Sequence, residues 1–384
     1  MITTVGTKNL LDVRNLSVDY SAASGAVHAV DKVNFSLKRG EILGLAGESG
    51  CGKSTLAYAI TRLLRPPAYI TGGEVLYYPP EDRERAAVIS NLSQADGSAT
   101  SGSIDILSLT PTQLRHFRWN ELSIVFQSAM NSLNPVLTVG TQIMDVLKTH
   151  RPDMGPDLRR QRAIELLKLV GIASDRLRSF PHELSGGMRQ RAVIAIALAL
   201  RPELIIMDEP TTALDVVVQR EILELISGLC KEFNMALIFI THDLSLLLEL
   251  ADSVAIMYAG KIVEKASSKD LYLHPCHPYS YGLLNSFPNL HGPRRNMGGI
   301  PGSPPDLRAV PTGCTFHPRC PMVFGPCPRV LPVLQPALAG AMMDGNEQQV
   351  ACHLYDRRFS TGELPNAEQF AAAYAAKIER GKSR

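Results

Sequence analysis

An eight-residue stretch, Gly47 to Ser54, constrains this chain more than any other feature. It reads GESGCGKS and matches the phosphate-loop pattern G-x-x-x-x-G-K-S/T at every fixed position. Its glycines allow successive backbone N–H groups to turn toward phosphate oxygens. Lys53 supplies a positive charge for the β- and γ-phosphates, and Ser54 supplies a hydroxyl ligand for Mg²⁺. The stretch therefore predicts a binding site for ATP and Mg²⁺.

The segments around this loop indicate an α/β domain, which argues against a chance match in a glycine-rich turn. Residues 41–46 form a short apolar run that predicts a strand, and residues 53–64 predict a helix that ends at Arg65-Pro66-Pro67. Alternating apolar and polar residues predict antiparallel strands at 10–18 and 27–37. Short apolar runs predict buried parallel strands at 204–207 and 236–240.

Two carboxylates, Asp208 and Glu209, follow the apolar run at 204–207. A strand does not end in buried carboxylates unless they have partners, because an unpaired buried charge is costly. Asp208 is therefore predicted to hold Mg²⁺, directly or through water, and Glu209 to polarise the water that attacks the γ-phosphorus.

A second anion site is indicated by Ser185-Gly186-Gly187, which opens a helical run. A serine hydroxyl, free N–H groups and a helix N-terminus together attract negative charge. One ATP held at the phosphate loop does not need such a site. Taken alone, the motif favours an ordinary helix N-cap with a flexible turn.

Taken together, these motifs resemble the ATP-binding cassette (ABC) family. The phosphate loop, Gln127, residues 184–190, Asp208-Glu209, Asp215 and His242 occur in the family's order. The resemblance implies a P-loop NTPase with a RecA-like core, an antiparallel β subdomain and a helical subdomain, followed by a small Cys-rich C-terminal region. It places the nucleotide-binding domain at residues 1–260, with the helical subdomain at about 128–190, and the C-terminal region at 261–384. Residues 79–103, rich in Pro, Ser, Asn and Gly, are expected to be a surface insertion.

The resemblance also implies roles for individual residues, each matched by its place in a motif. Catalysis would depend on Glu209, His242 and Gln127, and Mg²⁺ would be held by Ser54, Gln127 and Asp208. The nucleotide would contact Tyr20, which stacks on adenine, and Gly47, Ser49, Gly50, Cys51, Gly52, Lys53, Ser54 and Thr55. In the family two subunits pair head to tail, so ATP on the partner would be contacted by Ser185, Gly186, Gly187 and Gln190. Asp215 would lie at that interface.

Two further segments resemble the ABC ATPases that energise import of di- and oligopeptides: residues 129–135, AMNSLNP, and 300–307, IPGSPPDL. The resemblance implies a second ATPase subunit, forming a heterodimer, two membrane permeases and, indirectly, an extracytoplasmic solute-binding protein. Nickel or an oligosaccharide is the alternative solute, because the ATPase does not touch the cargo. A non-transport ABC ATPase is a more distant alternative that predicts a long coiled coil or two cassettes.

The charge and hydropathy of the chain bear on its location and partners. Lys plus Arg total 39 and Asp plus Glu total 37, so the net charge of 39 − 37 = +2 gives no reason to expect a nucleic-acid partner. No charged segment followed by an apolar one opens the chain, and its apolar runs are too short for a bilayer. The chain is therefore expected to be soluble and to lie, through its partners, on the cytoplasmic face of the membrane.

Four cysteines gather near the C-terminus, at Cys314, Cys320, Cys327 and Cys352. Disulfides are disfavoured in a reducing cytosol, and zinc sites usually show paired C-x2–4-C knuckles, which are absent here. A [4Fe–4S] cluster takes four Cys, and the family resemblance favours it, with zinc as the alternative. Arg319 and His317 are expected either to hydrogen-bond the cluster or to be solvated. Loss of the cluster is expected to leave ATP binding intact.

Close to the C-terminus, residues 368–377 are expected to be helical, with Phe370, Tyr374 and Ile378 at i, i+4 and i+8. This stripe is predicted to pack against the helix's own domain.

Overall fold

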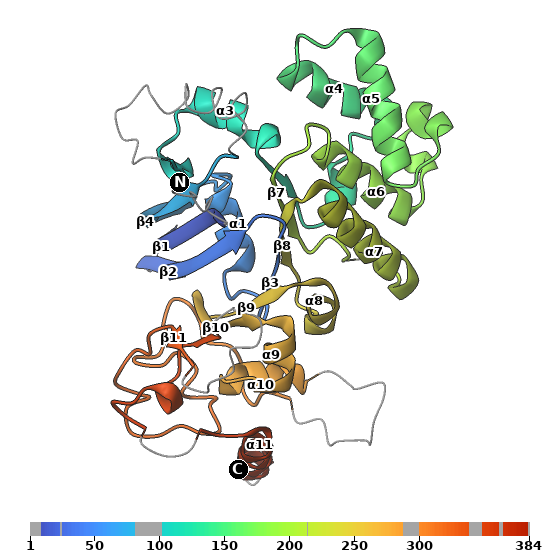
Figure 1. Cartoon of the computed structure of the whole chain (residues 1–384). Coiled ribbons are helices and arrows are strands. Elements are labelled where there is room, and N and C mark those ends of the chain that lie inside the picture. The colour runs from blue at the N-terminus through green and yellow to red at the C-terminus, as the bar shows by residue number, and fades with distance from the viewer. Residues whose placement is uncertain are drawn as a thin grey trace, which may run out of the picture.

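The computed structural model describes residues 9–23, 25–80, 102–212, 214–286, 299–337, 348–360 and 364–382. The fold is built on two β-sheets. Figure 1 shows a group of helices beside one sheet and an irregular C-terminal region below it. Most of the expected surface insertion, residues 81–101, lies outside the described residues. Among the helices that are described, none is both long and apolar enough to cross a membrane.

The first sheet has four strands in the order β2-β1-β4-β5. Its members are β1 (Asn9–Ala22), β2 (Gly25–Lys38), β4 (Ala68–Tyr77) and β5 (Ile104–Asp105). Neighbouring strands run antiparallel, which confirms the prediction made from the alternating pattern at 10–18 and 27–37. Alternation places one row of side chains, including Leu16 and Val33, in a buried cluster against the second sheet.

The second sheet has eight strands in the order β11-β12-β10-β9-β3-β8-β7-β6. Its strands are β3 (Ile42–Ala46), β6 (Leu122–Val125), β7 (Leu204–Asp208), β8 (Ala236–Ile240), β9 (Ser253–Tyr258), β10 (Lys261–Ser267), β11 (Gln335–Pro336) and β12 (Gln349–Val350). The central strands β9, β3, β8, β7 and β6 are parallel, which confirms the prediction for the apolar runs at 204–207 and 236–240. Ile205 and Met207 enter one hydrophobic cluster and Leu204 and Ile206 the other, so the sheet is buried on both faces.

Helices cover this sheet and extend beyond its β6 edge. They are α1 (Lys53–Ile60), α3 (Pro111–Asn120), α4 (Val139–His150), α5 (Pro156–Leu169), α6 (Gly186–Ala197), α7 (Val216–Phe233) and α8 (Leu244–Leu250). Figure 1 shows α4, α5 and α6 grouped to one side of the sheet, where their apolar residues share one cluster with it. Short 3₁₀ turns connect the elements at η1 (Ile106–Ser108), η2 (Ala129–Ser132), η3 (Ser174–Arg178), η4 (Pro181–Glu183) and η5 (His353–Tyr355).

The helix after the phosphate loop is shorter than expected, since α1 ends at Ile60 and not at residue 64. Arg62 adopts a left-handed backbone conformation with φ 53°, which an α-helix cannot contain. The Leu63 N–H then bonds back to the Tyr58 carbonyl at 2.8 Å, and this pattern closes the helix.

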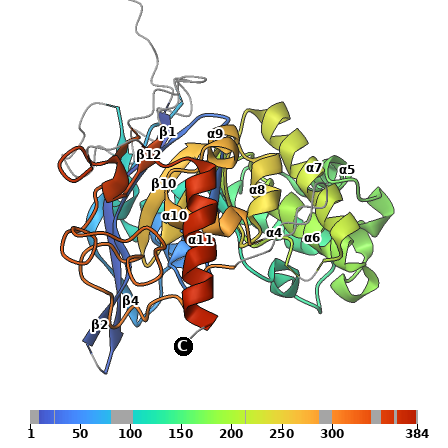
Figure 2. The ribbon, with the colours of Figure 1, turned by 90° about the horizontal axis from the view of Figure 1, so that it is seen from below.

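The C-terminal region wraps against the β10 edge of the second sheet. It contributes the strands β11 and β12 and the helices α9 (Ser268–Leu273), α10 (Pro278–Leu284) and α11 (Ala367–Lys382). Figure 2 shows α11 lying beside α10. Phe370 and Tyr374 of α11 stack on Tyr281 with ring centroids 5.3 and 5.8 Å apart, which confirms the predicted packing of this helix.

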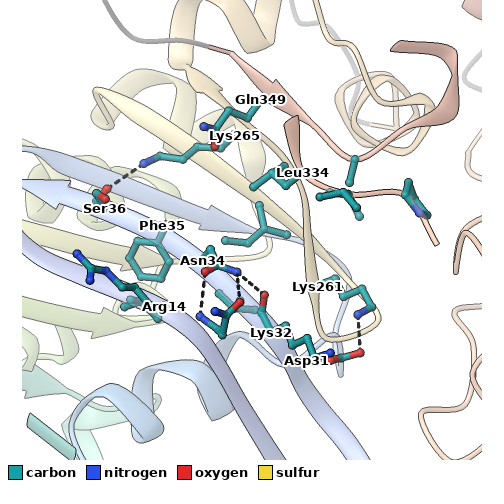
Figure 3. Close-up of a pocket in the computed structure, with 18 of the residues that line it drawn as sticks. Arg14, Asp31, Lys32, Asn34, Phe35, Ser36, Lys261, Lys265, Leu334 and Gln349 are labelled. Atoms are coloured by element: carbon teal, nitrogen blue, oxygen red, sulfur yellow. Dashed lines mark hydrogen bonds and ion pairs between the residues drawn. The ribbon is translucent and has the colours of Figure 1, made fainter. Parts of the chain in front are cut away.

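A cavity of ≈ 750 Å³ separates the first sheet from the C-terminal region (Figure 3). Its walls come from β1, β2, β10 and residues 331–334. Among its basic side chains, Lys261 pairs with Asp31, and Lys265 Nζ donates to the Ser36 carbonyl at 2.8 Å. The phosphate loop is not among its lining residues, so this cavity is separate from the site predicted by the sequence.

Candidate nucleotide-binding site

Every residue predicted to act on the triphosphate follows a central parallel strand of the second sheet. The phosphate loop follows β3, Asp208 ends β7, Gln127 lies after β6, and His242 lies after β8. Because the carboxyl ends of neighbouring parallel strands meet at one edge, the topology brings these residues together. This edge is where open α/β sheets bind ligands.

The phosphate loop turns in a way that only glycine accommodates. Gly47, Gly50 and Gly52 have φ values of 151°, 79° and 106°. A Cβ added at Gly47 would lie 2.3 Å from the Met257 carbonyl oxygen, and one added at Gly52 would lie 2.2 Å from that of Ala29. The loop is therefore pressed against neighbouring backbone, and α1 begins immediately after it at Lys53.

Lys53 lies inside the curve of this loop and is buried. Its Nζ donates to the carbonyl oxygens of Gly47 at 2.8 Å and Glu48 at 3.0 Å. Beside it, burial raises the pKa of the Cys51 thiol, although the charge of Lys53 opposes this effect. The ammonium group is thus fixed at the position from which a P-loop lysine reaches phosphate oxygens.

Ser54 and Asp208 meet across the site, with the Ser54 hydroxyl donating to Asp208 Oδ1 at 3.1 Å. Asp208 is fully buried, and burial raises the pKa of its carboxyl group while the bond from Ser54 opposes that rise. Its second oxygen, Oδ2, has no hydrogen-bond partner in the described structure. A hydroxyl beside a buried carboxylate with a free oxygen is a suitable donor set for Mg²⁺, which binds oxygen ligands.

Glu209 connects the two remaining predicted catalytic residues. Its Oε2 accepts hydrogen bonds from Gln127 Nε2 and the Thr212 hydroxyl, each at 3.0 Å. Its Oε1 lies 3.2 Å from His242 Nδ1. Glu209 also has a left-handed backbone with φ 47°, an uncommon conformation that sets the direction of its side chain. The fold therefore assembles Gln127, Glu209 and His242 into one group.

Tyr20 lies near the start of α1, where its hydroxyl and that of Thr55 are 3.1 Å apart. Ser49 is part of the loop between Gly47 and Gly50. Sequence reasoning missed Tyr58, whose pKa is raised by burial and, to a smaller extent, by the Asp208 carboxylate. Tyr58 stands four residues after Ser54, and this helical spacing places both on one face of α1.

The predicted signature residues lie on a different part of the molecule, at the N-terminus of α6. Ser185 caps this helix by accepting the Met188 N–H at 3.2 Å. Gly186 and Gly187 face Met130, Leu214 and Val218, with Val218 Cγ1 only 2.7 Å from a Cβ built on Gly187. Gln190 is buried, and its Nε2 has no hydrogen-bond partner among the described atoms. Asp215 caps α7, and the next two residues, Val216 and Val217, are 80% and 69% exposed.

The four C-terminal cysteines are all buried and line one small cavity together with apolar residues such as Phe316 and Met322. Burial raises the pKa of Cys314 to about 11 and that of Cys320 to about 12. It also raises the pKa of Cys327 and Cys352. Within the described residues, no group of three or more His, Cys, Asp and Glu side chains is arranged to hold a metal ion.

Arg319 differs from both expected arrangements, whereas the expectation for His317 remains a prediction. Arg319 is 6% exposed and forms a two-pronged ion pair with Glu48 of the phosphate loop, at 2.6 and 2.9 Å. His317 Nδ1 lies 2.9 Å from the Cys314 carbonyl oxygen. The expectation that these side chains either contact a cluster or are solvated is therefore wrong for Arg319, whose partner lies 271 residues away.

Known proteins resemble this chain in both of its parts. Residues 30–212 match the family described as ABC transporter, and residues 263–327 match the oligopeptide/dipeptide transporter C-terminal region. The oligopeptide transport ATP-binding protein AppD of Bacillus subtilis is 41% identical over 90% of this chain and 97% of its own length. OppD of Escherichia coli, also named an oligopeptide transport ATP-binding protein, is 42% identical over 84% of this chain and 89% of its own length.

Among solved structures, the dimeric ATP-binding cassette MJ0796, bound to ADP and Pi in a post-hydrolysis state, matches with a TM-score of 0.55 and 27% identity. The match covers 67% of this chain and 99% of the cassette's own chain. The matching fold places an ATPase cassette around the group of residues described above. The chain therefore belongs to the ABC transporter ATPases, in the group that carries the oligopeptide/dipeptide transporter C-terminal region.

Proposed function

We propose that this chain is the ATP-binding and ATP-hydrolysing subunit of an ABC importer that takes up di- or oligopeptides across the cytoplasmic membrane. One observation carries the proposal. Lys53, Ser54, Asp208 and the Gln127–Glu209–His242 group gather at one sheet edge, in a chain whose relatives are oligopeptide transport ATP-binding proteins. Nickel or an oligosaccharide remains the alternative cargo.

The residues divide the chemistry among them. The backbone of the phosphate loop and Lys53 bind the β- and γ-phosphates, while Tyr20 stacks on adenine. Ser54, Asp208 and Gln127 hold Mg²⁺, which neutralises charge on the phosphate oxygens when it is bound. Glu209 orients and polarises the attacking water, and His242 contacts the γ-phosphate. The hydrogen bonds from Gln127 and Thr212 to Glu209 support this assignment, because they fix the carboxylate that must face the water.

A second subunit completes each site. The signature residues Ser185, Gly186, Gly187 and Gln190 contact ATP on the partner, and Asp215 lies at the shared interface. Support comes from the place of Ser185 at the N-terminus of α6, the Nε2 of Gln190 that has no partner among the described atoms, and the exposed apolar side chains of Val216 and Val217. The dimeric solved cassette is a precedent for pairing. By family resemblance, the partner is a related ATPase, so the pair is a heterodimer.

The membrane partners are two permease subunits, with a solute-binding protein acting outside the membrane. Three apolar residues near Gln127 support a docking surface here, because Phe126, Val136 and Leu137 are 39%, 75% and 39% exposed. The chain then works as a peripheral subunit on the cytoplasmic face. Its nucleotide-binding domain comprises residues 1–260, with a helical subdomain at about 128–190, and its C-terminal region comprises 261–384.

The C-terminal cysteines hold a [4Fe–4S] cluster, with zinc as the alternative. The support is that Cys314, Cys320, Cys327 and Cys352 surround one cavity. Because burial raises the pKa of these thiols, they need a nearby positive centre to become thiolates. A single zinc ion would draw its ligands to roughly 2.3 Å from one point, whereas a cluster spreads them further apart.

Metal analysis tests the cluster. Protein purified without oxygen should contain iron and sulfide and absorb visible light. A colourless protein with stoichiometric zinc and neither iron nor sulfide would refute the cluster and leave the transport proposal untouched.

Co-purification tests the transport function. The full chain, tagged and extracted from native membranes in mild detergent, should bring down two polytopic membrane proteins and a second ATPase. As a control, a chain with Val136 and Leu137 changed to Asp should be recovered without the membrane proteins. Recovery of the wild-type chain without any membrane protein would count against the importer role.

A further inference from the structure

The C-terminal region contacts the phosphate loop through an ion pair and a hydrogen bond, both at Glu48. Arg319 Nη1 donates to Glu48 Oε2 at 2.6 Å, and Nη2 donates to Oε1 at 2.9 Å. Glu48 is the second residue of the loop, directly after Gly47. Two parallel bonds between a guanidinium and a carboxylate fix both distance and direction, which a lysine in this place could not do.

Arg319 is held rigidly on its own side of this pair. Its Nε donates to the Pro301 carbonyl at 3.0 Å and its Nη2 to the Gly302 carbonyl at 3.2 Å. The guanidinium also lies 5.8 Å from the Tyr258 ring and 6.0 Å from the Phe316 ring. Burial alone would lower the pKa of Arg319, but the hydrogen bonds with Glu48 and Tyr258 outweigh it and raise that pKa. Arg319 is therefore a fixed, charged anchor.

The backbone of Glu48 connects the position of Arg319 to the rest of the phosphate loop through hydrogen bonds. Its N–H donates to the Tyr279 hydroxyl at 2.9 Å. Its carbonyl oxygen accepts Lys53 Nζ at 3.0 Å and the Cys51 N–H at 3.3 Å. A displacement of Glu48 would therefore move the carbonyl that positions Lys53.

The charge of Glu48 is a second reason to expect that Arg319 affects ATP binding. A carboxylate in a loop that binds the phosphates of ATP repels them, since like charges at short range in a partly buried site interact strongly. The Arg319 guanidinium neutralises this carboxylate and holds it by both oxygens. Without Arg319, the loop would contain an uncompensated negative charge beside Lys53.

We propose that Arg319 is a positioning residue for the phosphate loop, which neutralises Glu48 and fixes its backbone so that the loop binds ATP tightly. It acts through Glu48 and does not touch the nucleotide. This inference rests on the proposed ATP site. It also makes ATP affinity depend on the fold of the cysteine segment, because Arg319 directly precedes Cys320.

The test is the affinity of the full chain for a fluorescent ATP analogue, MANT-ATP, with Mg²⁺. Arg319→Met, which keeps the bulk and removes the charge, should weaken binding roughly tenfold, a size within measured couplings of contacting residues. Arg319→Lys keeps the positive charge but cannot form the two parallel hydrogen bonds to Glu48, so it should lose less affinity for MANT-ATP than Arg319→Met does. The exposed arginine of the same segment provides the matched control, and Arg329→Ala should bind as the wild type does.

A second substitution that restores binding separates a positioning role of Arg319 from a general loss of folding. Glu48→Gln removes the carboxylate that Arg319 neutralises, so the Arg319→Met/Glu48→Gln double variant should recover most of the lost affinity. Melting temperatures without nucleotide report any loss of folding. Should Arg319→Met not fold, the same comparison is made with Arg319→Lys, which should bind at least severalfold more weakly than the wild type.

The outcomes are distinct. The inference is overturned if the folded Arg319 variant binds the analogue as tightly as the wild type, or if Glu48→Gln gives no recovery. The proposed ATP site fails separately, if the wild type does not bind the analogue or if Lys53→Ala binds it equally well.

Discussion

At the scale of single residues, the site is a set of short hydrogen bonds that leave specific atoms free. Asp208 uses one carboxylate oxygen for Ser54 and keeps the other unbonded. Glu209 is held from Gln127 and Thr212 and lies beside His242. The sequence predicted Gln127, Glu209 and His242 as a group through family resemblance, and the fold brings them together. Their catalytic roles remain predictions.

Other contacts were beyond the reach of sequence reasoning. The bond between Thr212 and Glu209 spans three residues in a turn, where no periodic pattern exists. The pair of Arg319 with Glu48 joins positions 271 residues apart, and no local pattern signals such a pair. Because cysteines neighbour Arg319 in the sequence, it was expected to hydrogen-bond a cluster or to be solvated. Its observed contact also argues against the expectation that ATP binding is independent of the C-terminal segment.

The first prediction at this scale concerns Lys53. Lys53→Ala should weaken ATP binding roughly 100-fold or more, because the phosphates lose a buried charge partner. Isothermal titration with MgATP measures this change. Lys269→Ala removes an exposed lysine of α9 and should bind normally. Comparable affinity of Lys53→Ala and wild type would mean that this loop does not hold the phosphates.

At the scale of elements, the strands that could be predicted from the sequence are those with a regular pattern of apolar residues. The alternating segments became β1 and β2, and the short apolar runs became β3, β7 and β8, because burial of one or both faces decides both pattern and structure. The strands β11 and β12 have two residues each and exist only through pairing with each other and with β10. Tertiary contacts define such strands, so the sequence could not predict them.

The second prediction concerns α11, which docks through buried Phe370. Phe370→Ala should cost about 3–5 kcal/mol of local stability, because it removes a fully buried aromatic ring that stacks on Tyr281. Limited proteolysis should then cut within residues 364–382 much faster than in the wild type. Glu368→Ala changes an exposed residue of the same helix and should leave the cleavage rate unchanged. Equal protease resistance of Phe370→Ala and wild type would show that α11 does not depend on this contact.

At the scale of the whole molecule, the phosphate loop and the predicted signature residues lie on different elements, before α1 and at the start of α6. The phosphate loop lies at the carboxyl edge of the second sheet, while the bonds of Ser185 to Met188 and Arg189 stay within its own helix. The C-terminal region contacts the phosphate loop through Arg319 and Tyr279. Pairing of two subunits would bring a phosphate loop and a signature together.

The third prediction follows from this pairing. Ser185→Arg should leave MANT-ATP binding by the isolated chain unchanged, because the substitution lies outside its own phosphate loop. In the assembled transporter the same variant should reduce ATP hydrolysis at least tenfold, roughly the effect of removing one group that stabilises developing charge. Ser174→Arg alters an exposed serine in the same helical group and should have neither effect. Loss of ATP binding by the isolated Ser185→Arg chain would contradict the arrangement in trans.

If ATP hydrolysis at Glu209 drives peptide uptake, a Glu209 variant that binds ATP without hydrolysing it must fail to restore transport. Uptake of a radiolabelled oligopeptide is followed in cells that lack this chain and receive either wild type or Glu209→Gln. The wild type should restore uptake. The variant, present at the same level and still able to bind ATP, should restore less than about one hundredth of it, as expected when a general base is lost. Uptake with Glu209→Gln at the wild-type rate would show that hydrolysis at Glu209 does not drive transport.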